Sequence, residues 1–268
     1  MNKPEGALRI ATWNVNSILA RLPTALSVLE RLDADVVCLQ EIKCEEARFP
    51  RLELEDRGYH LAVLGQKSYN GVALLSRLPL EDVRYGLPGE DGEAQARYVE
   101  AVVLAAGGRA VRVGCLYAPN GNPVSSEKFA YKLAWSARLA EHAATLLQQE
   151  EALVLAGDYN IIPRDEDCFD PEAWRGDALF RPESRAAYRR LLHLGLSDAF
   201  LQADGRARQY TFWDYQAGAW QRDKGIRIDH LLLSPEAADR LEGVRIHREA
   251  RGMDKPSDHV PVSVDLRL

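Results

Sequence analysis

Polar residues whose side chains are suited to catalysis follow or close six apolar segments of this sequence. In chain order they are Asn14 and Asn16 in ATWNVNS, Glu41 in VVCLQE, Tyr117 and Asn120 in GCLYAPN, Asp158 and Asn160 in VLAGDYN, Asp229 in GIRIDHLLLS, and Asp258 and His259 in PSDHVP. Each alone has an ordinary explanation, because Asn and Asp occur in turns and a strand tyrosine usually belongs to the core. Six such segments in one chain predict instead that their ends meet at one rim of a sandwich and form a common cleft.

The carboxylates among these residues predict a metal site. Acidic side chains share a cleft only when something neutralises their mutual repulsion, and a divalent cation does so. The candidate ligands mainly offer oxygen, and no Cys or His pair has the spacing of a zinc site. Oxygen donors suit Mg²⁺ or Mn²⁺ better than zinc or copper, so one of these two ions is the expected cofactor.

Apolar runs and their periodicity predict the elements that position these residues. The expected strands are LRIATWNV, DVVCLQE, GVALLS, RYVEAVVL, RAVRVGCLY, ALVLAGD, QYTFWDY, RIDHLLLS and VPVSVDL. Helical spacing predicts helices over residues 23–32, 125–150 and 183–194. Because many strands are consecutive and few βαβ units alternate, we expect two sheets flanked by helices in a single domain, 1–268, rather than a doubly wound sheet or a (β/α)₈ barrel.

Composition bounds the class of protein. Of the 268 residues, 46% are hydrophobic and 28% charged, which is enough apolar surface for a large core. No apolar run approaches the roughly 20 residues that cross a bilayer, and the N-terminal MNKPEGALRI lacks the apolar stretch of a secretory signal. The four cysteines have no CxxC spacing, which favours reduced and mostly buried thiols. We therefore expect a cytoplasmic protein with no membrane partner.

Six motifs that span residues 12–261 resemble the exonuclease III family of apurinic/apyrimidinic (AP) endonucleases, of the bacterial exodeoxyribonuclease III type. In order they are TWNVNS, LQEIK, LYAPNG, GDYNIIP, RIDHLLLS and SDHVP. This family lies within the endonuclease/exonuclease/phosphatase superfamily. The resemblance implies a four-layered α/β sandwich, in which two mixed β-sheets pack face to face and are flanked by helices. That fold agrees with the strands and helices expected above.

The resemblance also implies a division of the cleft between metal and nucleophile. It makes Glu41 the principal metal ligand, with Asn14 and Asp258 close to it. Asp158 and Asn160 are placed across the cleft, as a second metal site or around the nucleophile. The sequence leaves open whether one or two metal ions bind.

Two residues compete for the role of general base. Asp158 is preferred because the family places this aspartate near the attacking water, and Tyr117 is the alternative, as a phenolate or as a hydrogen-bond donor to the phosphate. His259 is expected to contact the scissile phosphate and is also counted among the metal-site residues, while Asp229 holds its second ring nitrogen. A carboxylate in that position fixes the tautomer and favours the protonated imidazole. Because neighbours on an extended chain point to opposite sides, Asp258 can serve the metal while His259 serves the phosphate.

Basic residues between the motifs bear on the substrate. The net charge of −6 argues mildly against a nucleic-acid partner. Arg and Lys nevertheless gather between the motifs, with Lys132 on the long helix among them. Together with Arg222 and Lys224 they are expected to form a track that binds DNA phosphates. Asn120, in the YAPN turn, is a further candidate phosphate donor. The alternative for the basic residues is ordinary solvated surface charge.

An aromatic segment is the candidate substrate pocket. By the resemblance, Phe212, Ile226 and Ile228 wall a slot for a flipped-out abasic sugar that is too narrow for a normal base. Trp213 shifts the aromatic bulk by one residue and is a further candidate for the lining. The alternative is that these aromatic residues simply belong to the core of a sheet.

Taken together, the residues and the resemblance imply a divalent-metal-dependent DNA repair hydrolase that cleaves phosphodiester bonds in duplex DNA. We expect AP endonuclease, 3′→5′ exonuclease and 3′-phosphodiesterase or phosphatase activities on double-stranded DNA with abasic sites or blocked 3′ ends. The protein is expected to be a monomer in the cytoplasm, associated with the nucleoid when acting. One alternative is a phosphatase or phosphodiesterase of the same fold that acts on lipid or small phosphate esters. Another is a non-catalytic binding module, which would have lost at least one of Glu41, Asp158, Asp229 and His259.

Overall fold

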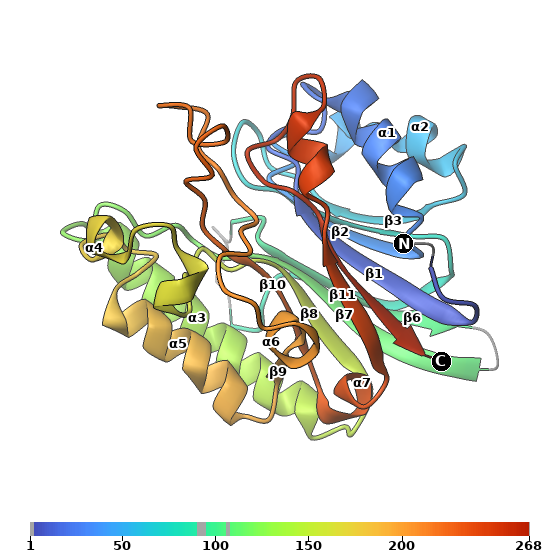
Figure 1. Cartoon of the computed structure of the whole chain (residues 1–268). Coiled ribbons are helices and arrows are strands. Elements are labelled where there is room, and N and C mark those ends of the chain that lie inside the picture. The colour runs from blue at the N-terminus through green and yellow to red at the C-terminus, as the bar shows by residue number, and fades with distance from the viewer. Residues whose placement is uncertain (1–2, 90–94, 106–107, 268) are drawn as a thin grey trace.

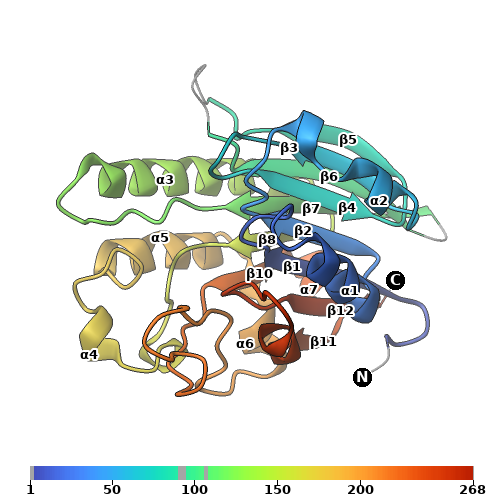
Figure 2. The same cartoon turned by 90° about the horizontal axis from the view of Figure 1, so that it is seen from above.

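The chain folds into four layers, shown in Figures 1 and 2 by a computed structural model that describes residues 3–89, 95–105 and 108–267. The outer layer on one side contains helix α1 (Leu22–Leu32) and the short α2 (Arg51–Glu55). Two sheets pack face to face in the middle, and helices α3 (Glu127–Leu147) and α5 (Pro182–His193) cover the other side. This arrangement confirms the four-layered α/β sandwich predicted from the sequence.

Sheet A contains six strands in the order β11-β12-β1-β2-β4-β3. β1 and β2 are parallel, and every other neighbouring pair in this sheet is antiparallel. The inner strands β1, β2 and β4 are buried along their whole length, which explains their nearly continuous apolar sequences. The bounds are β1 (Ala7–Asn14), β2 (Val36–Gln40), β3 (His60–Leu64), β4 (Val72–Ser76), β11 (Leu241–Ile246) and β12 (Val262–Arg267).

Sheet B also contains six strands, in the order β5-β6-β7-β8-β10-β9. Here β7 and β8 are the parallel pair, and the other neighbours are antiparallel. The bounds are β5 (Leu80–Tyr85), β6 (Tyr98–Ala105), β7 (Arg109–Tyr117), β8 (Leu153–Asp158), β9 (Ser197–Asp198) and β10 (Asp229–Leu233).

The same arrangement of elements occurs in both sheets, although no repeat is evident in the sequence. In each, a helix connects the two parallel strands, as in β1-α1-β2 and β7-α3-β8. An antiparallel strand (β4 or β10) and a short edge strand (β3 or β9) follow outward. Because parallel strands end at the same edge, each sheet presents two strand ends at one rim.

Three apolar layers hold the sandwich together. Successive strand residues point to opposite faces, so each inner strand contributes to two layers. Ile10 and Val36 pack between the sheets, whereas Ala11 and Val37 pack beneath α1. A third layer, which includes Trp135, joins sheet B to α3 and α5.

The long helices begin where local sequence signals predict. Pro182 is the first residue of α5, and Pro23 stands in the first turn of α1. Ser126 precedes α3, and its Oγ accepts a hydrogen bond from the backbone N of Lys128 at 3.3 Å. The remaining short helical segments are η1 (Glu46–Arg48), η3 (Asp165–Asp167), α4 (Pro171–Trp174), α6 (Ala199–Ala203), α7 (Pro235–Ala238) and η4 (Arg248–Gly252).

One predicted strand is wrong. Residues 209–215 form no strand, and Phe212 makes only isolated bridges to Ile226 and His259. Its backbone N and O instead bond to Ile226 at 3.0 and 3.1 Å, so two irregular segments lie side by side at the rim. The edge strands β3, β5 and β11 went unpredicted. β5 shows the reason, since most of its side chains are exposed and several are charged.

Candidate active site

Strand direction brings the predicted polar residues to one rim of the sandwich. β1 ends at Asn14, and the parallel β2 ends one residue before Glu41. In sheet B the parallel strands β7 and β8 end at Tyr117 and Asp158, which are register partners. β10 runs antiparallel to β8, so it begins with Asp229 opposite Asp158. The topology therefore assembles this part of the site.

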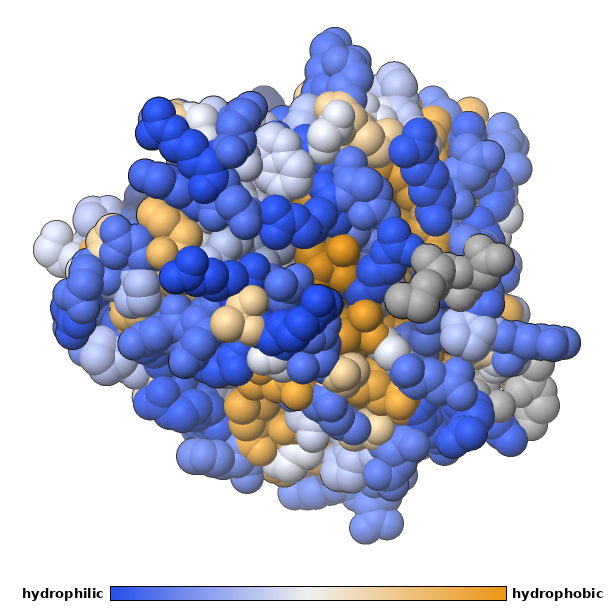
Figure 3. Space-filling model, viewed as in Figure 1, coloured by the Kyte–Doolittle hydropathy of each residue, from blue (hydrophilic) through white to orange (hydrophobic). Residues whose placement is uncertain are grey.

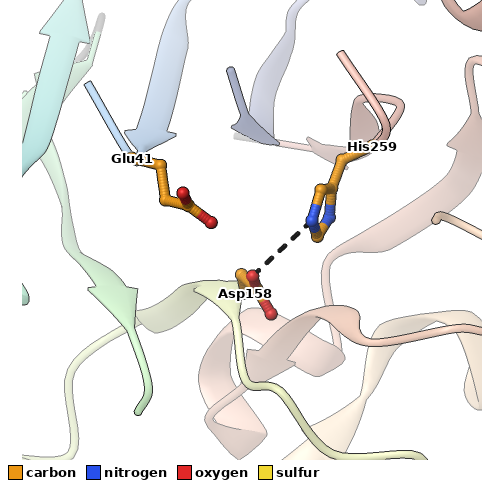
Figure 4. Close-up of side chains that lie close together, drawn as sticks. All are labelled: Glu41, Asp158 and His259. Carbon is orange, nitrogen blue, oxygen red and sulfur yellow. Dashed lines mark ion pairs between the residues drawn. The ribbon is translucent and has the colours of Figure 1, made fainter. Parts of the chain in front are cut away.

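Asn14 connects the carboxylates contributed by the two sheets. Its Nδ2 donates to Glu41 Oε1 at 2.8 Å and to Asp158 Oδ2 at 3.0 Å. Asn14 is fully buried, so these contacts are shielded from water. In Figure 4, the side chains of Glu41, Asp158 and His259 point into a common space from different parts of the fold.

The imidazole of His259 lies between two aspartates. Its Nδ1 is 2.9 Å from Asp229 Oδ2, and its Nε2 is 3.8 Å from Asp158 Oδ2 (Figure 4). The hydroxyl of the buried Thr211 donates to Asp229 Oδ2 at 2.6 Å and so orients that carboxylate. The contact between Asp229 and His259 is the one expected from the sequence.

His259 and Asp158 both have strongly shifted pKa values. Burial alone would lower the pKa of His259, but the charge and hydrogen bond of Asp229, together with Asp158, raise it to about 10. Burial raises the pKa of Asp158 to about 7, although the nearby His259 acts in the opposite direction. At neutral pH the protonated imidazole of His259 can donate a hydrogen bond, and the carboxylate of Asp158, with its raised pKa, can accept a proton.

Glu41 differs from Asp158 because a lysine compensates its charge. Lys43 Nζ lies 2.7 Å from Glu41 Oε2 and also donates to Asn16 Oδ1 at 2.6 Å. Burial would raise the pKa of Glu41, but Lys43 and the hydrogen bond from Asn14 lower it below its ordinary value. Glu41 is therefore kept as a carboxylate, the form that binds a metal ion.

The donor atoms at the rim suit a hard divalent cation. Among the described residues, one ligand atom each from Glu41, Asp158 and His259 lies within 4.8 Å of the others. The two carboxylates supply the oxygen donors that Mg²⁺ or Mn²⁺ prefers. The predicted ligand Asn14 instead turns its Nδ2 towards them, and its Oδ1 accepts from the backbone N of Asn16 at 3.1 Å. Asp258 lies outside this group of three, and its Oδ1 accepts from Asn16 Nδ2 at 3.0 Å.

Tyr117 is held as a neutral phenol. Burial, followed by the charges of Glu41 and Asp158, raises its pKa well above the ordinary value. The guanidinium of Arg97 lies 4.8 Å from the ring centroid, and its Nη1 donates to the Tyr117 carbonyl at 3.1 Å. A phenol with a raised pKa donates a hydrogen bond at neutral pH but does not act as a base, which favours Asp158 as the base.

Asn120 and Asn160 form a second polar group beside Asp158. Asn120 Nδ2 donates to Asn160 Oδ1 at 3.2 Å, and the backbone N of Asn160 donates to Asp158 Oδ1 at 2.8 Å. Beneath them lies Lys132 of α3, whose Nζ donates to the carbonyls of Pro119, Asn120 and Asn160 at 3.1, 3.2 and 2.6 Å. Burial lowers the pKa of Lys132 to about 7. These main-chain contacts tie the two asparagine-bearing loops to one helix.

The predicted substrate residues separate into two groups. Phe212 and Ile226 line a pocket beside the site, and the Phe212 ring is centred 4.9 Å from that of His259. Ile228 is buried behind this wall, in an apolar cluster with Ile226. Trp213 does not line the pocket, because its ring packs against the other face and its Nε1 donates to Asp223 at 3.0 Å.

Two of the predicted phosphate-binding cations lie in the same loop but in different surroundings. Arg222 and Lys224 are both exposed. Lys224 lines the pocket and its Nζ lies 5.6 Å from the centroid of the Phe169 ring, whereas Arg222 is not among the lining residues.

Figure 3 shows that the face seen there is mainly hydrophilic, with hydrophobic residues in small patches between charged and polar ones.

Comparison with known proteins identifies the family. Residues 11–259 match the model of the endonuclease/exonuclease/phosphatase family. The chain belongs to this family. It is 32% identical to exodeoxyribonuclease III of Haemophilus influenzae, over 97% of this chain and all of that protein. Every helix among the described residues is too short or too polar to span a bilayer.

Two solved structures extend the likeness to the whole fold. The 3′ phosphatase NExo from Neisseria, bound to a product DNA hairpin, is 40% identical, with a TM-score of 0.92 over 97% of this chain and 99% of that one. An AP endonuclease from Archaeoglobus fulgidus is 34% identical, with a TM-score of 0.90 over 97% of this chain and 100% of that one. A DNA repair nuclease function and a requirement for a divalent metal ion are accordingly typical of the family to which this chain belongs.

Sequence reasoning missed two residues of the site, Lys43 and Thr211, and misplaced a third, Lys132. Lys43 lies two positions after Glu41, but both residues have a left-handed backbone beyond the end of β2, so strand alternation gave no signal for their contact. Lys132, which the sequence placed among the basic residues of the expected phosphate track, is instead fully buried on α3 and bonded to main-chain carbonyls. Thr211 had no distinguishing pattern, because its position depends on the irregular segment around Phe212.

Proposed function

We propose that this chain is a divalent-metal-dependent DNA repair hydrolase with AP endonuclease, 3′→5′ exonuclease and 3′-phosphodiesterase or phosphatase activities. The observation that carries the proposal is the meeting of Glu41 and Asp158 across Asn14, with the imidazole of His259 held beside them by Asp229. A metal ion, a base and a cationic donor in one cleft are the groups that phosphodiester hydrolysis requires.

The metal would be held principally by Glu41, whose carboxylate accepts a hydrogen bond from Asn14 Nδ2, and Mg²⁺ or Mn²⁺ fits the oxygen donors of this cleft. When bound, the ion supplies Lewis-acid polarisation and neutralises charge on the phosphate and leaving oxygen. We assign Asp258 to a supporting position beside Asn16 rather than to the central group.

The remaining steps belong to side chains of this chain. Asp158 accepts the proton of the attacking water, since burial keeps its proton affinity close to neutrality. His259, protonated and fixed by Asp229, donates a hydrogen bond to the phosphate and stabilises the charge that builds up there. The neutral phenol of Tyr117 and the amides of Asn120 and Asn160 provide further hydrogen-bond donors or a fixed frame for them.

The proposed substrate is double-stranded DNA with abasic sites or blocked 3′ ends. Relatives support this choice, because NExo was solved with a DNA hairpin and another neighbour is named an AP endonuclease. Arg222 and Lys224 would contact DNA phosphates from the loop beside the pocket. We further propose that residues 1–268 form one domain that acts as a cytoplasmic monomer and associates with the nucleoid while at work.

A single assay tests this function. Duplex DNA that contains one abasic analogue, and a second duplex with a 3′ phosphate, are incubated with the protein in Mg²⁺, Mn²⁺ or EDTA. We expect strand nicking and 3′-end release with either ion, and none in EDTA. Asp158→Asn, run in parallel, should show that the products come from this site. Undiminished cleavage in EDTA, or by Asp158→Asn, would contradict the proposal.

A further inference from the structure

A pocket of about 470 Å³ opens beside the catalytic group and is lined from two sides by aromatic rings. One side comes from the irregular segment after β8 and contributes Phe169 and Trp174. The other comes from the loop before β10 and contributes Phe212 and Ile226. None of the sequence motifs includes Phe169 or Trp174, and the functions assigned above make no use of either ring.

The inner wall of this pocket is continuous with the catalytic centre. The ring of Phe212 is centred 4.9 Å from that of His259, and the backbone of Phe212 is hydrogen-bonded to Ile226, which lines the same side of the pocket. A group that enters the pocket is therefore adjacent to whatever phosphate His259 contacts. This connection points to a part of the DNA substrate, rather than to an independent ligand, as the occupant.

The size and lining of the pocket suit a planar, partly polar group. Its volume falls in the range of about 300–1,000 Å³ typical of small-molecule sites, which is more than a bare sugar needs. Phe169, Trp174 and Phe212 are only half-buried, so their rings have faces or edges still open to contact. Asp214, which also lines it, offers an acceptor for the amino or imino hydrogens of a base, whereas the carboxylate of Asp177 already accepts from Asn122.

The aromatic residues are fixed in place before any substrate arrives. The backbone N of Phe169 donates to Gly225 O at 3.1 Å, which ties the two sides of the pocket together. Trp174 packs against the same buried cluster as Phe212. Asp177 accepts hydrogen bonds from Asn122 Nδ2 at 3.1 Å on both carboxylate oxygens. Prepositioned rings lose little conformational freedom when a ligand binds.

We propose that this pocket is a base-binding subsite, in which Phe169 and Trp174 stack on the nucleobase of an unpaired 3′-terminal nucleotide during its removal. The inference rests on the proposed nuclease function and departs from the expectation of a slot too narrow for a normal base. Water adds to the phosphorus while the bond from phosphorus to the penultimate O3′ breaks, and that oxygen takes up a proton. The products are a nucleoside 5′-monophosphate and a strand with a 3′ hydroxyl.

The test compares two DNA duplexes that differ only in their last residue. One carries a mismatched 3′-terminal thymidine and the other a 3′-terminal abasic analogue, and kcat/KM is measured for each. Base–aromatic stacking makes a difference of roughly 5- to 150-fold per base. We expect Trp174→Ala to lower the ratio of thymidine to abasic removal by an amount in this range. Trp174→Phe, which keeps an aromatic ring, should restore most of the ratio.

Two further variants separate stacking from general damage. Phe169→Leu keeps apolar volume but removes the ring, and should lower the same ratio. Tyr85→Ala removes a half-exposed ring from the edge strand β5, which does not line the pocket, and should leave the ratio unchanged. Equal losses on both duplexes in Trp174→Ala and Phe169→Leu, or no loss in either, would overturn the subsite.

A binding measurement gives a readout that is independent of cleavage. The duplex carries 2-aminopurine at its unpaired 3′ end, and the protein is added in EDTA while anisotropy reports the bound fraction. Stacking should quench the fluorescence of the bound base in the wild type, and Trp174→Ala should quench it less at the same bound fraction. Equal quenching would count against the proposal. If the wild type cleaves neither duplex in Mg²⁺ or Mn²⁺, the nuclease function itself fails, which is a different outcome.

Discussion

Sheet A and sheet B contain the same βαβ unit, yet the carboxylates that follow their second parallel strands differ in environment. Glu41, after β2 of sheet A, has an 18% exposed side chain and contacts Lys43. Asp158, at the end of β8 of sheet B, has a 2% exposed side chain and faces His259. The pKa of Glu41 is lowered by Lys43 and Asn14, whereas the pKa of Asp158 is raised by burial.

We propose that this difference assigns the two carboxylates to two chemical roles. A carboxylate that stays ionised and reaches solvent suits a metal ion, which arrives from solution and must be attracted by charge. A carboxylate that is buried and has a raised pKa suits proton transfer. Asn14 bonds to both, so the two sheets hold these groups in a fixed relation.

The largest effect is expected from removing the base on the sheet B side. Asp158→Asn keeps the shape but cannot accept a proton, so kcat should fall by about 10³- to 10⁴-fold with metal and DNA both saturating. Asp265→Asn, which alters a pair with Arg9 away from the rim, is the matched control and should leave kcat near wild type. A loss of less than about tenfold in Asp158→Asn would place the base elsewhere.

The second prediction concerns whether Asp229 acts only through His259. His259→Asn should lower kcat by about 10²- to 10³-fold, and Asp229→Asn somewhat less, because the imidazole remains but loses its partner. If the two form one unit, the double variant should be little worse than His259→Asn alone. Multiplied losses in the double variant would show that Asp229 has a separate role.

Glu41→Gln tests the sheet A side and should act on metal binding more than on chemistry. The Mg²⁺ concentration at half-maximal rate should rise by roughly 10- to 100-fold, a scale typical of changes around metal sites. Part of the activity should return at high Mg²⁺, which Asp158→Asn should not show. Binding of Mn²⁺, followed by electron paramagnetic resonance, provides a readout without turnover. Unchanged Mn²⁺ affinity would remove Glu41 from the metal site.

A buried ion pair between Arg227 and Asp167 supports the loop on the sheet B side. We expect its contribution to the free energy of unfolding to depend on pH. Arg227 donates to both oxygens of Asp167, at 2.9 and 3.0 Å, and both residues are buried. Although burial opposes it, Arg164 and Arg227 lower the pKa of Asp167 to about 2. Because the pKa of this carboxyl is lower in the folded state than in the unfolded chain, the ion pair stabilises the fold at pH values above the unfolded pKa of about 4. This contribution is lost as the pH falls towards about 2.

Asp167→Asn should therefore lower the free energy of unfolding at pH 7 by at least about 2 kcal/mol. Part of that difference should disappear as the pH is reduced from about 4 to about 2. Urea unfolding at several pH values measures both. Asp165→Asn, which alters an exposed pair with Arg185, serves as the control. A pH-independent difference between Asp167→Asn and wild type would show that charge pairing is not the cause.

The smallest effect is expected at the exposed loop that carries Arg222 and Lys224, the two proposed contacts to DNA phosphates. Arg222→Glu and Lys224→Glu should each weaken duplex DNA binding several-fold at low salt and leave kcat at saturation largely intact. The slope of log affinity against log salt should become shallower by about one for each DNA phosphate that the variant no longer neutralises. Fluorescence anisotropy across a salt series measures this. Affinity that is flat across salt in the wild type would contradict a basic track.

The sequence predicted well the parts of the site that strand polarity controls. Asn14, Glu41, Asp158 and Asp229 all stand at strand ends, and topology alone brings such ends to one rim. Apolar runs identified the inner strands and so predicted two sheets flanked by helices, while the four-layered arrangement was implied by the family resemblance. The edge strands were not predictable, because exposed strands such as β5 carry charged residues and lack the apolar pattern that distinguishes a strand from a loop.

The pocket was less predictable because irregular segments build it. Phe212 and Trp213 are neighbours that face opposite directions, and no periodicity outside a regular strand shows which one faces the substrate. Phe169 and Trp174 come from a segment with only short helical turns, whose path depends on distant partners such as Arg227. Side-chain packing between residues so far apart in the chain cannot be deduced from local spacing in one sequence.

Lys132 has a consequence for how this site can change over time. Its ammonium bonds only to main-chain oxygens, at Pro119, Asn120 and Asn160, and makes no demand on the side chains at those positions. Asn120 can therefore be exchanged more freely than Asn160, because the backbone of Asn160 is left-handed (φ 49°) and its Nδ2 donates to the Ala118 carbonyl at 2.9 Å. A protein engineer who wishes to alter substrate preference can randomise position 120 and keep Lys132 and Asn160 constant. Through Lys132, helix α3 supports the backbone of the two loops without fixing which side chains they present to the cleft.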